Sequence, residues 1–350
     1  MALPSSITPA FSPDRPARCT LSCVVPAYNE AGHLAAFIDD LARALQPLCA
    51  SLEIIVVNDG STDATDSVMA SLLPRPGLRY LSLARNFGKE VALTAGIEHA
   101  RGDAVILIDA DYQHPLTLLP EMIRLWRDGY DMVYGVMASR EKEGLWRRWG
   151  VGMFYGLMEL SSSIRMPRHA GDFRLLDRKV ADALRQLPER NRFMKGLYAW
   201  VGYRSIGLPF TPAERASGHS SFNLHRLAQL AVNGIMAFTT LPLRVWSGIG
   251  AMISLGAFCY GLYIVVEHLI WGNDVRGWPT LAAGLMFFSG IQLISIGIVG
   301  QYLSQVYDEV KRRPLYLLAR DVDGGVAAHA NPDAGSHASA QAEAKQGRGP

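Results

Sequence analysis

Two carboxylates one residue apart, Asp109 and Asp111, follow the apolar run of residues 104–108. Mg²⁺ and Mn²⁺ prefer carboxylate, carbonyl and water ligands, and they usually share their site with substrate phosphates. An Asp-x-Asp triplet often occurs by chance, and a solvated loop is the simpler explanation of a lone triplet. Because this one follows an apolar run typical of a buried strand, we favour a metal site, with Asp111 and Gln113 facing the ion where the chain turns.

Asp59 follows a second apolar run, residues 52–57, within the sequence Asn-Asp-Gly-Ser. An aspartate that caps a helix next to a turn glycine explains this pattern. An aspartate that accepts hydrogen bonds from a nucleobase explains it equally well. Spacing alone leaves both interpretations open.

Several basic side chains near these polar clusters are candidates for binding phosphate, although each taken alone is more often a solvated surface charge. They are Arg85, Lys89, Arg174 and Arg215. Asp172 lies between Gly171 and the apolar run of residues 173–176. It is a candidate base or a carboxylate at an acceptor site, and from spacing alone a turn residue is the better interpretation.

The elements that must position these residues alternate between strand-like runs and helical patterns. The strand-like runs are residues 20–25, 52–57, 78–83, 104–108 and 131–136, and the helical patterns are residues 31–45, 62–73, 89–100 and 115–126. This order predicts an α/β fold with a mainly parallel sheet and helices on both faces. Ligands of such sheets bind at the carboxyl ends of the strands, where the polar clusters fall. No GxGxxG follows the first strand and no GxxxxGK[ST] occurs, which disfavours a Rossmann dinucleotide site and a P-loop.

The second half of the chain contains two uncharged apolar stretches, residues 245–266 and 279–306. Each exceeds the roughly 20 residues that cross a hydrocarbon core, so we predict two transmembrane helices rather than two buried core helices. Residues 311–313 are basic and Arg244 precedes the first stretch, while the connection carries only Arg276. The positive-inside rule then places both termini and the catalytic domain in the cytoplasm, with the hairpin in the inner membrane.

These patterns divide the chain into five predicted parts. They are a flexible arm over 1–18, a catalytic domain over 19–221, an interfacial amphipathic helix over 222–244, two transmembrane helices within 245–313 and a mostly disordered tail over 314–350. A second interfacial stretch is expected over 145–158. The tail is predicted to be disordered, above all from residue 321, because it has almost no large apolar residues.

The composition of the chain indicates which classes of binding partner are expected. The net charge is +2 without a long basic block, which argues against nucleic acid. The four cysteines have no metal-binding spacing and are expected to be free thiols on the reducing side of the membrane. Glycine and serine in both apolar stretches allow helices to associate, so a homo-oligomer is a possible assembly.

Six short motifs in order resemble the inverting family 2 glycosyltransferases with a GT-A fold, and among them the polyprenyl-phosphate glycosyltransferases, which include bactoprenol glucosyl transferases and dolichol-phosphate mannose synthases. The motifs are VVPAYNE at 24–30, VNDGSTD at 57–63, RNFGK at 85–89, DADYQ at 109–113, GDFRL at 171–175 and PERNRF at 188–193. The resemblance runs from about residue 21 to residue 315. It implies a nucleotide-sugar donor, with a UDP-sugar as the first expectation, a polyprenyl phosphate acceptor in the lipid bilayer, and Mg²⁺ or Mn²⁺ as cofactor.

The resemblance also implies roles for individual residues. It assigns nucleotide-sugar binding to Pro26, Tyr28, Glu30, Asp59, Lys89 and Asp109, metal binding to Asp109, Asp111 and Gln113, catalysis to Asp111, Asp172 and Arg174, and acceptor phosphate binding to Arg140, Arg174 and Arg215. A polyprenyl phosphate is already anionic, so the expected barrier is the meeting of two anions, which the metal and arginines offset. One in-line displacement would invert the anomeric centre.

Two positions depart from the pattern of similar proteins. Met137 stands where they usually have Arg, and Ser221 where they usually have a basic residue. Both departures remove charge from the expected phosphate region, and Arg140, His219 or Arg215 is hypothesised to compensate. Alternatives remain. A processive polysaccharide synthase would need a QxxRW motif, and this motif fails because position 145 is Leu. Two alternatives stay open. One is a glycosyltransferase with another acceptor, and the other is a non-catalytic membrane scaffold or lipid-translocation subunit.

Overall fold

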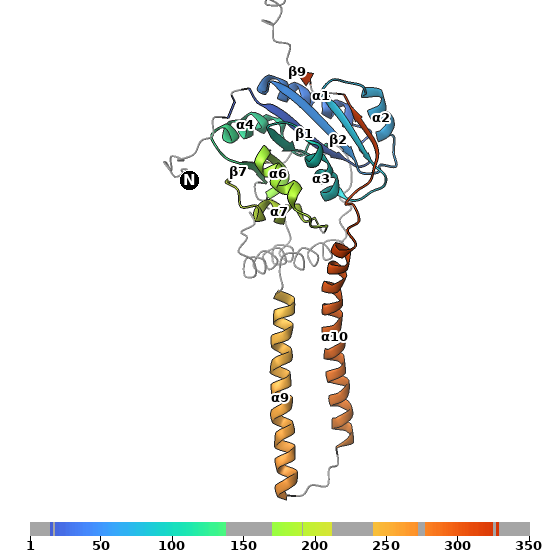
Figure 1. Ribbon diagram of the computed structural model, residues 1–350, viewed down its shortest axis with the longest axis vertical. Helices are drawn as coiled ribbons and strands as arrows, with labels where there is room; N and C mark the ends of the chain where they lie inside the picture. Colours follow the sequence, from blue (N-terminus) through green and yellow to red (C-terminus); the bar gives the residue numbers. More distant parts are fainter. Residues whose placement is uncertain are drawn as a thin grey trace, which may run out of the picture.

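The structure is a computed structural model that describes residues 15–16, 18–137, 170–190, 192–211, 241–271, 277–324 and 327–328. An α/β domain carries two long helices that extend from it side by side (Figure 1). Arg140, Arg215, Ser221, His219, the 145–158 stretch and residues 222–240 of the predicted interfacial helix lie outside the described residues.

The domain is built on a nine-stranded sheet in the order β7-β5-β6-β4-β1-β2-β3-β8, with β9 paired to β2. The strands are β1 Thr20–Ala27, β2 Ser51–Asn58, β3 Leu78–Leu83, β4 Ala104–Leu107, β5 Met132–Met137, β6 Ala170–Asp177, β7 Ser205–Phe210, β8 Leu318–Asp323 and β9 Ala327–Ala328. Pairing is parallel from β4 through β1 and β2 to β3, and between β5 and β7, whereas β6 and β8 are antiparallel to their neighbours. The predicted α/β fold with a mainly parallel sheet is confirmed.

Helices cover both faces of this sheet. They are α1 Leu34–Leu45, α2 Thr65–Leu72, α3 Lys89–His99, α4 Leu119–Arg127, α6 Arg178–Gln186 and α7 Met194–Trp200. Successive strand residues point to opposite faces, so Cys23 joins the core under α1, α2 and α4, while Val24 joins the core under α3, α6 and α7. Cys19, Cys23 and Cys49 are free and buried, whereas Cys259 is free and exposed.

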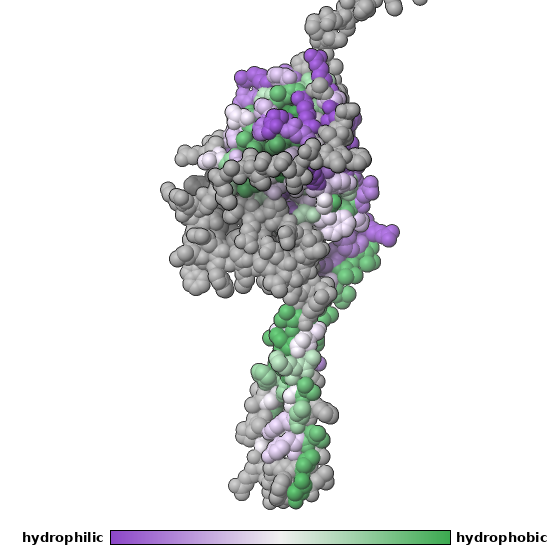
Figure 2. Space-filling view, turned by 90° about the vertical axis from the view of Figure 1, so that its left-hand side faces the viewer, coloured by the Kyte–Doolittle hydropathy of each residue, from purple (hydrophilic) through white to green (hydrophobic). Residues whose placement is uncertain are grey.

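The two long helices are α9 Leu241–Trp271 and α10 Trp278–Val310. Trp246 Nε1 of α9 donates a hydrogen bond to Ser295 Oγ of α10. Many large apolar side chains of these two helices are exposed, and Leu285 is 72% exposed. Figure 2 shows apolar surface along the helices. By length and composition one segment of the described residues, Phe287–Val310, qualifies as a membrane span. The predicted stretch 245–266 is helical within α9, but its passage through a membrane remains a prediction.

The tail expected to be mostly disordered over 314–350 begins with an ordered strand. Residues Leu318–Asp323 form β8 and pair antiparallel with β3, so the prediction is wrong for this segment. Its stabilising contacts are backbone pairing and charge: Asp321 accepts two hydrogen bonds from the Arg79 guanidinium, at 3.0 and 2.8 Å. A poor apolar content does not prevent a strand from pairing with a sheet edge that would otherwise be open.

The predicted flexible arm, residues 1–18, also contains a fixed point. The Arg15 guanidinium lies 2.9 Å from carboxylate oxygens of Asp131 and Asp177, and 4.9 Å from the centre of the Trp126 ring. Because these partners belong to α4, β6 and the loop before β5, Arg15 is fixed to the domain by three separate elements.

Candidate active site

The polar clusters meet at one edge of the sheet. In the parallel register Ala27 of β1 pairs with Asn58 of β2, and Val24 of β1 pairs with Leu107 of β4. The loops that follow these three strands therefore leave the sheet at neighbouring points. This confirms the expectation that the clusters lie at the carboxyl ends of parallel strands.

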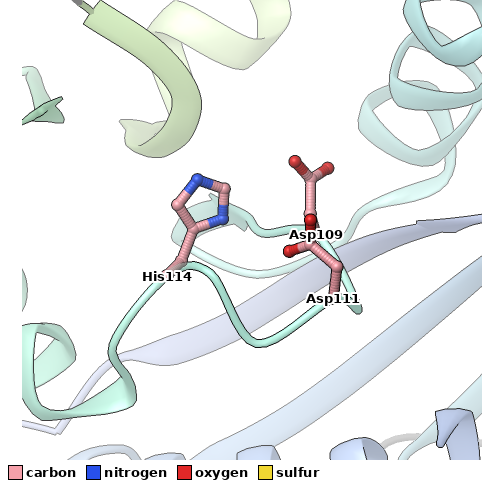
Figure 3. Close-up of side chains that lie close together, drawn as sticks. All are labelled: Asp109, Asp111 and His114. Carbon is pink, nitrogen blue, oxygen red and sulfur yellow. The ribbon is translucent and has the colours of Figure 1, made fainter. Parts of the chain in front are cut away.

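The loop after β4 brings three potential metal ligands together. Asp109, Asp111 and His114 each offer a ligand atom, and these atoms lie within 4.8 Å of one another (Figure 3). The loop turns at Tyr112, whose φ is 59°, and the Gln113 N–H donates to Asp111 Oδ1 at 3.1 Å. Asp109 and Asp111 thus meet as predicted, with His114 as a partner that the sequence reasoning missed. The metal role of Gln113 stays a prediction.

The surroundings of His114 fit a metal ligand. The residue is 5% exposed, and its ring stacks on Phe173 at 4.9 Å between centroids. Burial lowers the pKa of His114, so the imidazole is neutral near pH 7. Its Nδ1 is buried and has no hydrogen-bond partner among the described residues. A neutral imidazole with an unpartnered buried nitrogen beside two carboxylates is a donor set suited to Mn²⁺ or Mg²⁺ with mixed nitrogen and oxygen ligands.

A lysine bridges two carboxylates beside this group. The Lys89 ammonium, at the start of α3, lies 2.7 Å from Asp109 Oδ2 and 3.1 Å from Asp172 Oδ2. Burial alone would lower the pKa of Lys89, but the two carboxylates raise it above its ordinary value. Burial would likewise raise the pKa of Asp172, yet Lys89 and Lys195 hold it below its ordinary value. Lys89 and Asp172 therefore stay charged at neutral pH.

Asp59 secures the loop that carries Lys89. The residue is 3% exposed, and its two oxygens accept hydrogen bonds from the backbone N–H groups of Phe87 at 2.7 Å and Gly88 at 2.9 Å. Burial raises the pKa of Asp59, and these two hydrogen bonds partly offset the effect. The helix-cap interpretation is wrong, because α2 begins at Thr65, whose N–H donates to Asp63. Contact with a nucleobase remains a prediction.

The glycine after Asp59 is required by this arrangement. Gly60 has a φ of 63°, and a Cβ there would lie 2.4 Å from the Arg85 carbonyl carbon. The loops after β2 and β3 therefore touch backbone to backbone, which only glycine permits. This contact places the Arg85–Lys89 motif directly against the Asn58–Asp63 motif.

Three of the residues predicted to bind nucleotide lie at the end of β1 and in the loop after it. Pro26 belongs to β1, and the Tyr28 side chain after it is 46% exposed and open to a ligand. Glu30 pairs with His33 at 2.8 Å; burial raises the pKa of Glu30, and Asp111 and Asp109 raise it further against the opposing effect of His33. Glu30 therefore lies near the two carboxylates of the metal-ligand group, and the contact of Pro26, Tyr28 and Glu30 with nucleotide stays a prediction.

Arg174 is a buried arginine of β6. It is 2% exposed, its Nε donates to the Gly171 carbonyl at 3.1 Å, and its guanidinium lies 4.2 Å from the centre of the Tyr198 ring. Burial lowers its pKa. Arg174 thus supplies a buried positive charge that helps to lower the pKa of Asp172, and its roles in catalysis and in binding acceptor phosphate stay predictions.

Glu90 is a second residue that the sequence reasoning missed. Its Oε2 accepts a hydrogen bond from the Met194 N–H at 2.6 Å, which ties α3 to the start of α7. Burial, reinforced by the charge of Asp172, raises its pKa to about 7. Its position directly after Lys89 was the available signal, but its partner lies 104 residues away in the chain.

Comparison with known proteins identifies the family of this chain. The model of glycosyl transferase family 2 matches residues 22–185. An uncharacterized glycosyltransferase of Synechocystis is 44% identical over 300 residues, which cover 85% of this chain and 94% of that protein. A prophage-derived bactoprenol glucosyl transferase of Shigella flexneri is 41% identical, over 87% of this chain and 99% of its own.

A solved structure is similar at a greater distance. Glucosyl-3-phosphoglycerate synthase from Mycobacterium tuberculosis, in complex with Mn²⁺, UDP-glucose and phosphoglyceric acid, is 22% identical over 62% of this chain and 78% of its own, with a TM-score of 0.41. The family assignment rests on the sequence relatives, whose similarity extends over nearly their whole length. This chain belongs to glycosyl transferase family 2.

Proposed function

We propose that this protein is an inverting glycosyltransferase that moves a sugar from a UDP-sugar to a polyprenyl phosphate in the membrane, for modification of cell-envelope glycans. The observation that carries the proposal is the meeting of Asp109, Asp111 and His114 with the Lys89–Asp172 ion pair at one edge of the sheet. The acceptor class is supported by the bactoprenol glucosyl transferases, which are 41% identical over most of the chain.

Asp109, Asp111 and His114 are the residues that would hold a divalent ion. Such an ion supplies positive charge that stabilises a leaving diphosphate. The unpartnered buried Nδ1 of His114 supports its inclusion, since a neutral imidazole nitrogen without a hydrogen bond is ready to bind a cation.

Lys89 is the residue that offsets repulsion between donor and acceptor. Its ammonium contacts Asp109 on the donor side and Asp172 on the side of β6. An acceptor oxygen forms a bond to the anomeric carbon while the bond from that carbon to the diphosphate breaks, and the nucleoside diphosphate leaves. The acceptor needs little deprotonation because it is already anionic, so fixed positive charge is the main requirement.

The helices supply the proposed route to the acceptor. Phe287–Val310 has the length and composition of a span. The predicted second span within α9 would complete a hairpin with the catalytic domain on the cytoplasmic side, where residues 311–313 supply positive charge next to the span.

The test is transfer from radiolabelled UDP- and GDP-sugars to undecaprenyl phosphate in detergent, with Mn²⁺ or Mg²⁺. The active-site variant is Asp111→Ala, and Asp128→Ala, an exposed aspartate at the end of α4, is the matched control. We expect lipid-extractable label with the wild type and the control, and loss of it with Asp111→Ala. If the wild type is folded and transfers label to lipid from none of these donors, the proposal is refuted, and another acceptor or a non-catalytic role is favoured.

A further inference from the structure

A large cavity lies where α10 meets the catalytic domain, apart from the carboxylate site. Its volume is about 890 Å³. Three parts of the fold form its walls: the last turns of α10 with the linker that follows, the segment before α7 with α7 itself, and the first turn of α3. Representative lining residues are Gln301, Glu309, Arg312, Arg190, Leu197 and Val91.

The cavity is lined by four basic residues and by three acidic ones, Glu189, Asp308 and Glu309. Lys311, Arg312 and Arg313 line the cavity together with Arg190. Among the described residues, no ion pair or side-chain hydrogen bond neutralises Arg190, Arg312 or Arg313. Of the acidic residues, Glu309 accepts a hydrogen bond from the Arg190 backbone N–H at 2.7 Å. The cavity thus presents guanidinium groups whose hydrogen-bond donors are available to an anion with several oxygens.

The position of the cavity connects the candidate span to the active site. Gln301 and Glu309 belong to the end of Phe287–Val310, where a membrane span would leave the hydrocarbon core. On the opposite wall, Val91 lies two residues after Lys89, in the first turn of α3. Leu197 belongs to α7, whose start Glu90 holds by its hydrogen bond to Met194. One end of the cavity is therefore at the expected membrane surface, and the other is adjacent to the helix that presents the catalytic ammonium.

We propose that this cavity receives the phosphate head group of the polyprenyl acceptor from the membrane, with Arg190 and Arg312 as its first phosphate contacts. The inference rests on the proposed function and adds the place where its lipid substrate enters. The apolar chain of such a lipid stays beside α10, while its phosphate meets the guanidinium groups at the level of the span end. A phosphate-terminated single chain suits a cavity whose lining includes apolar side chains, such as Val91 and Leu197, as well as basic ones.

Binding can be tested without turnover. The full-length protein in detergent would be irradiated with a photoreactive polyprenyl phosphate, and labelled peptides would be identified by mass spectrometry. We expect label in the peptides that contain residues 301–315 and 189–197, removed by unlabelled undecaprenyl phosphate but not by phosphatidylglycerol. Absence of label from both peptides would overturn the proposal. Equal competition by phosphatidylglycerol would also overturn it, because the site would then hold bulk anionic lipid.

Kinetics give a second and independent readout. In Arg190→Gln and Arg312→Gln, alone and combined, we expect the KM for undecaprenyl phosphate to rise, by roughly tenfold in the double variant, because charge-assisted contacts to phosphate are lost. The KM for the nucleotide-sugar should not change. The control is Arg124→Gln, which removes an exposed arginine on α4. An unchanged acceptor KM in the double variant, or an equal rise in the control, would contradict the proposal.

The two experiments also separate this inference from the function on which it rests. Label in the cavity peptides without sugar transfer by the wild type would refute the glycosyltransferase proposal and leave the lipid phosphate site standing. Sugar transfer without label, and with an unchanged acceptor KM in the variants, would leave the function standing and refute the entry site. Thermal unfolding and donor binding of each variant establish that it is folded.

Discussion

The buried carboxyl of Glu90 makes the stability of this protein depend on pH in a way that one substitution should remove. Burial and the neighbouring charge of Asp172 raise the pKa of Glu90 from an ordinary 4.5 to about 7. Lys89 and Lys195 face the same carboxyl and act in the opposite direction, as does the hydrogen bond from Met194. Since the folded state binds this proton more tightly than the unfolded state, the favourable contribution is complete below pH 4.5 and is lost as the pH rises through 7.

The size of the effect follows from that difference. At about 1.4 kcal/mol per pKa unit, the raised pKa corresponds to about 3 kcal/mol between low and high pH, and less if the site relaxes. Glu90→Gln removes the titration but keeps an oxygen that can accept from the Met194 N–H. We therefore expect the stability of Glu90→Gln, relative to that of the wild type, to rise by about 2 kcal/mol when the pH is raised from 5.5 to 8.5. For a domain of this size that equals roughly 4–8 °C in Tm.

The assay is thermal unfolding of both proteins in detergent across that pH range, with Glu121→Gln as control. Glu121 is an exposed glutamate of α4 whose pKa Arg124 lowers, so its substitution should not change the pH dependence above pH 5.5. Parallel curves of Tm against pH for the wild type and Glu90→Gln would refute the reasoning, because they would mean that Glu90 does not titrate in this range.

Three further predictions follow from contacts near and far from the site. Asp59→Asn replaces an oxygen that accepts a backbone hydrogen bond by an amide donor, so it should lower stability by about 2 kcal/mol and loosen the loop before Lys89. The expected readouts are a lower Tm and a reduced kcat. An unchanged Tm would contradict the role assigned to Asp59. Met137→Arg restores charge at the end of β5, close to Gly171, and should lower the KM for the acceptor several-fold, whereas an unchanged KM would show that no acceptor phosphate lies near this position. Asp321→Ala leaves the Arg79 guanidinium without its paired carboxylate and should speed hydrogen exchange of the β8 amides by roughly tenfold or more; unchanged exchange would mean that backbone pairing alone holds β8.

The part of the site that follows parallel strands could be predicted from sequence. Apolar runs of five or six residues alternate with helical patterns, and parallel strands must end at a common edge. Asp59, Asp109 and Asp111 follow such runs directly, so their meeting required only the order of the elements. The same reasoning located Lys89, because it follows the next strand, β3.

Contacts between distant parts of the chain could not be predicted in this way. Rings from β5 and α7, Tyr134 and Tyr198, lie against the Arg174 guanidinium, and no local pattern around Arg174 indicates these contacts. β8 lies 235 or more residues after its partner β3 and forms through backbone hydrogen bonds, which leave no apolar pattern in the sequence. His114 was overlooked because its significance depends on Phe173, which buries the imidazole beside the carboxylates.

The most direct test of the account is the dependence of sugar transfer on Mn²⁺ concentration in the wild type, His114→Asn and the surface control Asp128→Asn. If Asp109, Asp111 and His114 hold the ion, the His114 variant should need at least about tenfold more Mn²⁺ for half-maximal transfer, and the control should match the wild type. Identical activation curves for His114→Asn and the wild type would contradict the assignment of this group as the metal site of the transferase.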